Sequence, residues 1–193
     1  MVLSIAAYGS SVLRKICSDI SPDYPMLGDL IENMWETMYY TNGVGIAAPQ
    51  VSKDIRLFVI DSEQVFNNTE EDDENEAFPG ETGFKGVFIN AHIVTLGGKD
   101  WSHNEGCLSI PNIRENILRK DSVTLDYLDE NFMQHRNTFS GLTGRIILHE
   151  YDHLDGKMFI DHISPLKKTL LKRKLDNISK GKISVKYKMS FPK

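Results

Sequence analysis

The sequence predicts an α+β fold in which antiparallel strands surround a central helix, with a further helix near each end of the chain. Apolar, β-branched runs dominate the middle of the sequence, and amphipathic patterns of helical period lie on both sides of them. The chain has 193 residues, of which 40% are hydrophobic and 25% are charged. This length and composition favour one globular domain that covers residues 1–193.

The first third of the chain is expected to contain an extended arm, a helix and a strand. Residues 1–8 are apolar but few and lack a basic start, which favours a strand or arm over a signal peptide. Asn42-Gly43 is expected to end the helix, with the glycine as the left-handed stop. Residues 55–61 are apolar and β-branched, as in a buried strand. The stripe that predicts the helix consists of Leu27, Leu30, Ile31, Met34, Trp35 and Met38.

The middle of the chain is predicted to alternate between strands and polar connections. Residues 62–83 are acidic and contain Pro79-Gly80, which predicts a surface loop or insert. The strands expected after this insert are residues 86–96, 122–128 and 134–139. The last two of these strands are predicted to pair as a hairpin.

Two helices are predicted in the C-terminal third. The first begins at Thr143 or Gly144 and carries two histidines. The second begins at Ser164-Pro165, because serine is a preferred helix cap and proline is favoured in the first turn. The buried stripe of this second helix is expected to consist of Leu166, Leu170, Leu171 and Leu175.

Two features of the composition bear on location. The only cysteines, Cys17 and Cys107, lie far apart in a chain without a recognisable secretory signal, which favours free thiols and a cytoplasmic protein. No run of about 18 apolar residues exists, so no membrane partner is expected.

The charge of the chain is unevenly distributed. The net charge is -5, yet residues 164–193 contain ten Lys or Arg and one acid, a charge of +9, so the remainder carries -14. Such a basic segment is either a solvated face or a contact for a polyanion, and the sequence leaves both open.

The segment His149-Glu150-Tyr151-Asp152-His153 has the spacing of a metal-binding helix. Residues four apart share one helix face, so both imidazoles can reach one ion. Glu150 would border the open position of that ion and could accept a proton from water. A catalytic site usually needs a third protein ligand.

The third ligand does not come from the positions that zinc proteases use. No glutamate follows Glu150, and Phe159 stands where an extended protease motif has its last histidine. Cys107 is the better candidate, because Gly106 and Ser109 beside it suit a backbone shaped around a site more than a core. Most lone buried cysteines are inert, and that alternative stays open.

A third segment, Gly43-Val44-Gly45-Ile46-Ala47-Ala48-Pro49-Gln50, offers an uncluttered backbone that ends in a polar side chain. Together with Glu105-Gly106-Cys107-Leu108-Ser109 and residues 149–156, it resembles the three motifs of the peptide deformylase family, in the family's order. The resemblance runs from about Ser11 to Pro165. Ile46 replaces a common leucine and Leu148 a common glutamine, and neither position is a ligand.

The resemblance implies removal of the formyl group from the N-terminal methionine of new polypeptides. It implies one divalent ion, Fe(II) with Zn(II) or Ni(II) as alternatives, held by Cys107, His149 and His153. Glu150 would be the general base. Gln50 and the Leu108 N–H would meet the developing negative charge. The residues implied in substrate binding are Val44, Gly45, Gly106, Leu142 and Ile146.

The resemblance also implies supporting contacts and partners. Arg145 would shape the rim of the methionine pocket, and Glu105 would pair with Arg119. Some family members hold the ribosome through a basic C-terminal helix, so residues 164–193 are a candidate ribosome contact. The other functions considered are a generic metallopeptidase and a catalytically silent ribosome- or metal-binding module. No DNA partner is expected.

Overall fold

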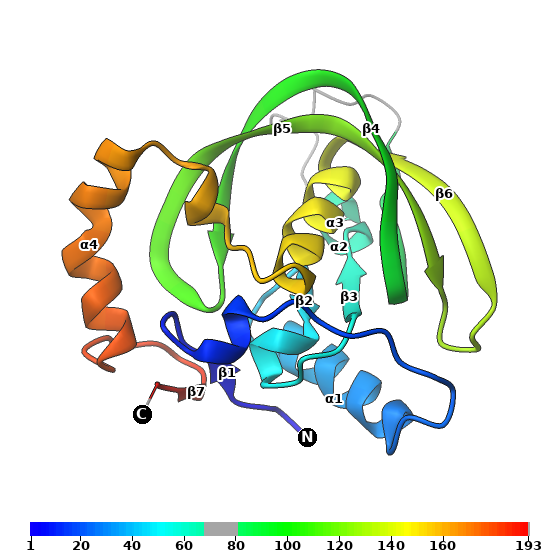
Figure 1. The fold of residues 1–193 in the computed structure, drawn as a ribbon, viewed down its shortest axis with the longest axis horizontal. Coiled ribbons are helices and arrows are strands. Elements are labelled where there is room, and N and C mark those ends of the chain that lie inside the picture. The colour runs from blue at the N-terminus through cyan, green and yellow to red at the C-terminus, as the bar shows by residue number, and fades with distance from the viewer. Residues whose placement is uncertain (68–80, 193) are drawn as a thin grey trace.

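The computed structural model describes residues 1–67 and 81–192 and has the predicted α+β class, with an antiparallel sheet and several helices (Figure 1). The sheet has the strand order β2-β3-β4-β5-β6, and all neighbouring strands in it are antiparallel. Its strands are β2 (Gly45–Ala47), β3 (Leu57–Asp61), β4 (Lys85–Cys107), β5 (Ile110–Leu128) and β6 (Gln134–Ser140).

Strands β4 and β5 are much longer than predicted and form one long hairpin. The predicted strand 86–96 ends just before Gly97-Gly98, and glycines usually weaken strands. Instead the register shifts between Gly97 and Asp100, where Gly98 has a φ of +72°, and pairing continues to Cys107↔Ile110. A bulge of this kind bends a strand without ending it. Cys107 therefore ends a strand and does not lie in a connection between strands.

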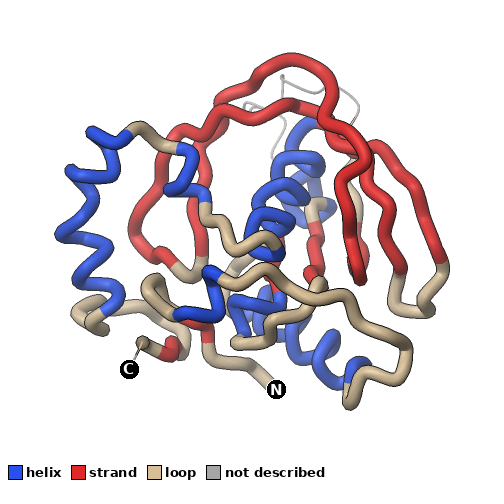
Figure 2. Tube along the Cα trace, in the orientation of Figure 1, coloured by secondary structure: helices blue, strands red, loops and turns tan. Residues whose placement is uncertain are grey.

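Helix α3 (Gly141–Leu154) lies inside the curve of the sheet, and the strands arch over it in Figure 2. It packs against β2, β3, β5 and β6. The helix begins earlier than predicted, because Gly141, with a φ of +58°, turns the chain directly out of β6. The carboxylate of Glu81 accepts hydrogen bonds from the first-turn N–H groups of Leu142 (3.1 Å) and Thr143 (2.8 Å).

Helix α1 (Leu27–Tyr40) buries most of its predicted stripe against the core that β2 and β3 share. The helix ends at Tyr40, just before the predicted Asn42-Gly43 stop. The left-handed residue of that pair is Asn42, with a φ of +54°. A Cβ at position 43 would lie 3.3 Å from Leu108 Cδ1, so Leu108 would have to shift by a few tenths of an ångström to accept a side chain there. The prediction that Gly43 is the left-handed stop was wrong.

Helix α4 (Pro165–Ser179) begins where predicted, and Ser164 accepts a hydrogen bond from the Lys167 N–H. Its buried stripe is Leu171, Leu175 and Ile178, which pack beside Ile113 and Ile117 of β5. Leu166 and Leu170 are each 72% exposed, so their predicted burial was wrong. They lie about 100° or more around the helix from the centre of this stripe. Because α4 contacts the hairpin along one narrow edge, side chains at that angle stay in solvent.

Both ends of the chain meet below the sheet (Figure 1). Strand β1 (Ile5–Ala6) pairs in parallel with β7 (Met189–Ser190). Three short 3₁₀ segments lie at η1 (Ser11–Arg14), η2 (Ala48–Val51) and η4 (Phe159–His162). No helix of the described part of the chain is long and apolar enough to cross a membrane.

Part of the acidic insert predicted at residues 62–83 lies within the described residues. Its start forms a short helix, α2 (Glu63–Asn67), and is not a loop. Residues 68–80, which carry the acidic run, lie outside the described residues.

Candidate active site

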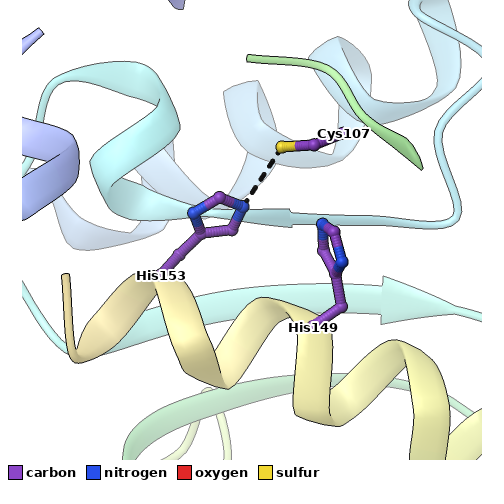
Figure 3. A group of neighbouring side chains, drawn as sticks. All are labelled: Cys107, His149 and His153. Atoms are coloured by element: carbon purple, nitrogen blue, oxygen red, sulfur yellow. Dashed lines mark hydrogen bonds between the residues drawn. The ribbon is translucent and has the colours of Figure 1, made fainter. Parts of the chain in front are cut away.

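The three predicted metal ligands converge at one place (Figure 3). Cys107 reaches it from the end of β4, and His149 and His153 reach it from adjacent turns of α3. One ligand atom from each residue lies within 4.8 Å of those of the other two. Cys107 Sγ lies 3.3 Å from His153 Nε2. The spacing of four residues on α3 places the two histidines on one face of the helix. The end of β4 then brings Cys107 to them from more than 40 positions earlier in the sequence.

The orientation of His149 is set by a carboxylate behind it. His149 Nδ1 lies 2.8 Å from Glu105 Oε2, which leaves the other ring nitrogen free to face Cys107. Arg119 donates two hydrogen bonds to Glu105, at 2.7 and 3.0 Å, so the predicted Glu105–Arg119 contact is present. Such a partner fixes the tautomer and direction of a ligand imidazole.

Arg145 is among the residues that line the cavity, and its guanidinium also reaches Glu105. It is 2% exposed and donates to Glu105 (3.0 Å) and to the Ile117 carbonyl oxygen (3.0 Å). The sequence analysis missed this second guanidinium on Glu105, because the contact depends on the register of β5. Burial by itself raises the pKa of Glu105, but its hydrogen bonds and charge interactions with His149 and Arg119 outweigh burial and hold that pKa well below the usual range.

The electrostatics around the sulfur favour a thiolate. Burial by itself raises the pKa of Cys107, but the charges and hydrogen bonds of His153 and His149 outweigh burial and lower that pKa. Burial likewise disfavours charge on His149, whereas its bonds to Cys107 and Glu105 raise its pKa well above the ordinary value. The lowered pKa of the Cys107 thiol and the raised pKa of the His149 imidazole have the same meaning: a positive charge beside the sulfur is stabilised.

The side chain of Glu150 is buried, although it carries a carboxylate. It is 4% exposed, and its Oε2 has no hydrogen-bond partner among the described residues. Burial raises the pKa of Glu150 to about 7, against the lowering effect of His149 and His153. Its carboxylate packs on Gly45, where an added Cβ would lie 2.7 Å from Glu150 Oε1. Glycine at position 45 is therefore needed to make room for this carboxylate.

Gln50 lies beside the sulfur with its amide oriented. Its Oε1 accepts a hydrogen bond from the Ala47 N–H (2.8 Å), and its Nε2 lies 3.5 Å from Cys107 Sγ. The tight path of β2 into η2 produces this geometry. Because the amide oxygen is already bound, Gln50 presents N–H groups to the site.

A cavity of about 1180 Å³ opens onto these groups. The predicted site residues that line it are Val44, Gly45, Gln50, Gly106, Cys107, Leu108, Leu142, Ile146, His149 and Glu150. His153 is 1% exposed and lies beneath this surface. The cavity walls also include residues 40–42 at the end of α1 and residues 184–187 near the C-terminus. The sequence analysis missed both segments, because neither carries a motif.

The residues present suit a divalent cation. A thiolate and two imidazoles are ligands that zinc and iron accept, and three protein ligands leave a position for water or substrate. A cation there would supply the positive charge that the sulfur attracts. Glu150, whose Oε2 has no hydrogen-bond partner within the described part of the chain, lines the same cavity. Cys17 and Cys107 are both free, as predicted.

Comparisons with known proteins agree with this geometry. A sequence model described as polypeptide deformylase matches residues 2–169. The peptide deformylase of Christiangramia forsetii is 52% identical over 192 residues, which cover 100% of this chain and 97% of that protein.

Solved structures agree as well. The structure of a Legionella pneumophila peptide deformylase has a TM-score of 0.77 at 34% identity and covers 94% of this chain and 98% of that one. A class I type b peptide deformylase of Acinetobacter baumannii, solved with Met-Ala-Ser bound, has a TM-score of 0.72 at 30% identity and covers 84% of this chain and 99% of that one. The chain belongs to the polypeptide deformylase family.

Proposed function

We propose that this protein is a metal-dependent hydrolase that removes the N-formyl group from the N-terminal methionine of new polypeptides. One observation carries the proposal. In a member of the deformylase family, Cys107, His149 and His153 converge, and Cys107, His149 and Glu150 line one cavity. Residues 1–193 would form one catalytic domain, with α3 as its central, metal-binding helix.

The proposed cofactor is one divalent ion per chain, held by Cys107, His149 and His153. Fe(II) is the proposed physiological ion, and Zn(II) or Ni(II) would fit the same ligands. When bound, the ion supplies Lewis acidity, which makes hydroxide available near neutral pH and polarises the formyl carbonyl group. Glu105, Arg119 and Arg145 support this role by fixing the ring of His149.

Glu150 is the proposed general base and acid. Its carboxylate lies at the cavity, with Oε2 free to accept the proton of the attacking water. A pKa of about 7 suits a group that must first take a proton and then release it to the departing amine.

Two donors are proposed to meet the negative charge that develops on the formyl oxygen. The first is Gln50 Nε2, whose orientation is set by the Ala47 N–H bond to the amide oxygen. The second is the backbone N–H of Leu108, in the turn after Cys107. A single donor of this kind typically contributes a factor of about 10²–10³ in rate.

The substrate is proposed to lie extended along the cavity. Val44, Gly45 and Gly106 would exchange backbone hydrogen bonds with the peptide. Leu142 and Ile146, with Val44, would surround the methionine side chain. A formyl carbon carries only hydrogen, so a closely packed site admits it and rejects acetyl by steric clash. The Met-Ala-Ser peptide bound to the Acinetobacter baumannii relative also begins with methionine.

Two other functions are less well supported. A generic metallopeptidase would take its third ligand from a Glu or His beyond the helix, whereas here the side chain that lies with the two histidines is Cys107. A catalytically silent module would be expected to close the metal site with a fourth protein ligand or to lack a base. The retained Glu150 and Gln50 argue against such a module.

The test is hydrolysis of formyl-Met-Ala-Ser compared with Met-Ala-Ser, using protein purified without oxygen. We expect formate release from the blocked peptide, no cleavage of the free peptide, and one Fe(II) per chain by elemental analysis. Removal of the ion by a chelator should abolish turnover, and added Fe(II) should restore it. Cleavage of the unblocked peptide would favour a metallopeptidase, and an inactive, fully loaded protein would favour the silent module.

We further propose that the basic C-terminal segment docks on the ribosome in the cytoplasm. Lys168, Lys172, Arg173 and Lys174 on α4 are exposed, as are Lys180, Lys182, Lys186 and Lys188 after it. Phosphate-rich RNA attracts such a face by releasing counterions, so binding should weaken steeply with salt. Plain solubility is the alternative role of these lysines.

Co-sedimentation with ribosomes at low and high salt tests this docking. A variant with Lys172, Arg173 and Lys174 changed to Gln should lose most of the binding seen at low salt. A variant with the exposed Lys53, Lys99 and Lys157 changed to Gln has the same net charge and should still bind. Equal binding by both variants, or none by the intact chain, would exclude α4 as the contact and leave the catalytic proposal intact.

A further inference from the structure

The segment after α4 turns back and reaches the active site. Gly181, with a φ of +67°, reverses the chain, and a Cβ added there would lie 3.4 Å from the ring of Phe191. The chain then runs to β7, which lies beside β1 (Figure 1). Hydrogen bonds to Lys188 and Ser190 from Ile5 (2.9 Å) and Ala7 (2.8 Å) hold the two end segments together.

These two end segments both hold the turn that follows the ligand Cys107. Leu108 and Ser109 form this turn between the paired residues Cys107 and Ile110. The Tyr187 hydroxyl donates to the Leu108 carbonyl oxygen at 2.8 Å, and the Tyr8 N–H donates to the Ser109 carbonyl oxygen at 2.9 Å. Each carbonyl group of the turn is therefore held by one end of the chain.

Tyr187 is suited to act as a permanent donor. It is half-buried, lines the cavity and packs against the same core cluster as Leu108. Burial, with the nearby charge of Cys107, raises the pKa of Tyr187 to about 12. The hydroxyl therefore keeps its proton near neutral pH.

We propose that Tyr187 is a positioning residue, which anchors the Leu108–Ser109 turn so that the Leu108 N–H points at the formyl oxygen as charge develops on it. The inference rests on the proposed function, because it assigns Tyr187 a task in that reaction. Tyr187 lies beyond residues 2–169, the part of the chain that the family model matches. The tail thus adds a support for the oxyanion donor that the three shared motifs do not contain.

The physical reason is that three peptide planes link the Cα atoms of Cys107 and Ile110. Pairing fixes the outer ends of the turn, but the inner planes can still rotate. The Tyr187 hydroxyl restrains the plane next to the one that carries the Leu108 N–H. Without it, the N–H samples other directions and stabilises the transition state less, whereas ground-state binding of the peptide changes little.

The test is Tyr187→Phe in the full chain, which removes only the hydroxyl. We expect kcat for formyl-Met-Ala-Ser to fall about tenfold, with KM within about twofold and metal content unchanged. The matched control is Tyr24→Phe, since Tyr24 packs against the same core cluster but does not line the cavity. This control should retain full kcat.

The outcomes separate this inference from the proposed function. If the intact enzyme releases formate and Tyr187→Phe has normal kcat, whether or not its thermal midpoint falls, Tyr187 only fastens the tail and the inference is wrong. A rise in KM with kcat unchanged would assign Tyr187 to substrate binding and would also overturn it. If the intact, metal-loaded enzyme releases no formate, the proposed function itself fails.

Discussion

Replacing Glu150 by glutamine is expected to lower kcat by about 10³-fold while the ion stays bound. Glutamine keeps the size of the side chain but cannot accept a proton. Glu150 contributes no atom to the Cys107, His149 and His153 group, so its loss should not release the ion. The amide should also fit the buried space, because Glu150 Oε2 has no partner among the described residues that the change would break.

The measurement combines kcat for formyl-Met-Ala-Ser with metal content by elemental analysis. Cys107→Ala is the contrasting variant, because it removes a ligand and should lose both the ion and turnover. If Glu150→Gln also lost the ion, Glu150 would be a ligand and not the base. Near-normal activity with the ion bound would remove Glu150 from proton transfer altogether.

Replacing Gly45 by alanine is expected to lower kcat/KM by about 10²-fold through Glu150. An added Cβ would lie 2.7 Å from Glu150 Oε1 and 2.9 Å from its Cγ, closer than such atoms approach in folded proteins. Gly45 lies in β2, a backbone conformation that alanine accepts, so the effect should come from the displaced carboxylate. Displacement of the carboxylate moves the base away from the water that it must deprotonate.

Gly28→Ala is the matched control, since a Cβ there meets nothing within 4 Å. Gly28 lies in α1, where alanine is about 0.5–1 kcal/mol more favourable than glycine, so this variant should be fully active and slightly more stable. The assay compares kcat/KM and metal content for both variants. Equal activity of Gly45→Ala and Gly28→Ala would show that Glu150 does not need the space at Gly45.

The positions of α1, α3, α4 and most strands could be predicted from local patterns. The period of apolar residues in α1 and the Ser164-Pro165 cap of α4 are properties of a few neighbouring residues. The errors occur where contacts are long-range. Leu166 and Leu170 look like part of an apolar stripe, but only the shape of the β4–β5 hairpin decides which edge of α4 is covered.

The sequence by itself determined the family and named three candidate ligands and a candidate base, because motif spacing on one helix and at one turn is local information. Only the tertiary structure decided how these groups are oriented. Arg145 and Arg119 meet on Glu105, Glu150 packs on Gly45, and Tyr187 reaches Leu108 across 79 positions of sequence. Such contacts depend on strand register and on the return of the tail, which are set by burial of the whole core, and no local pattern encodes them.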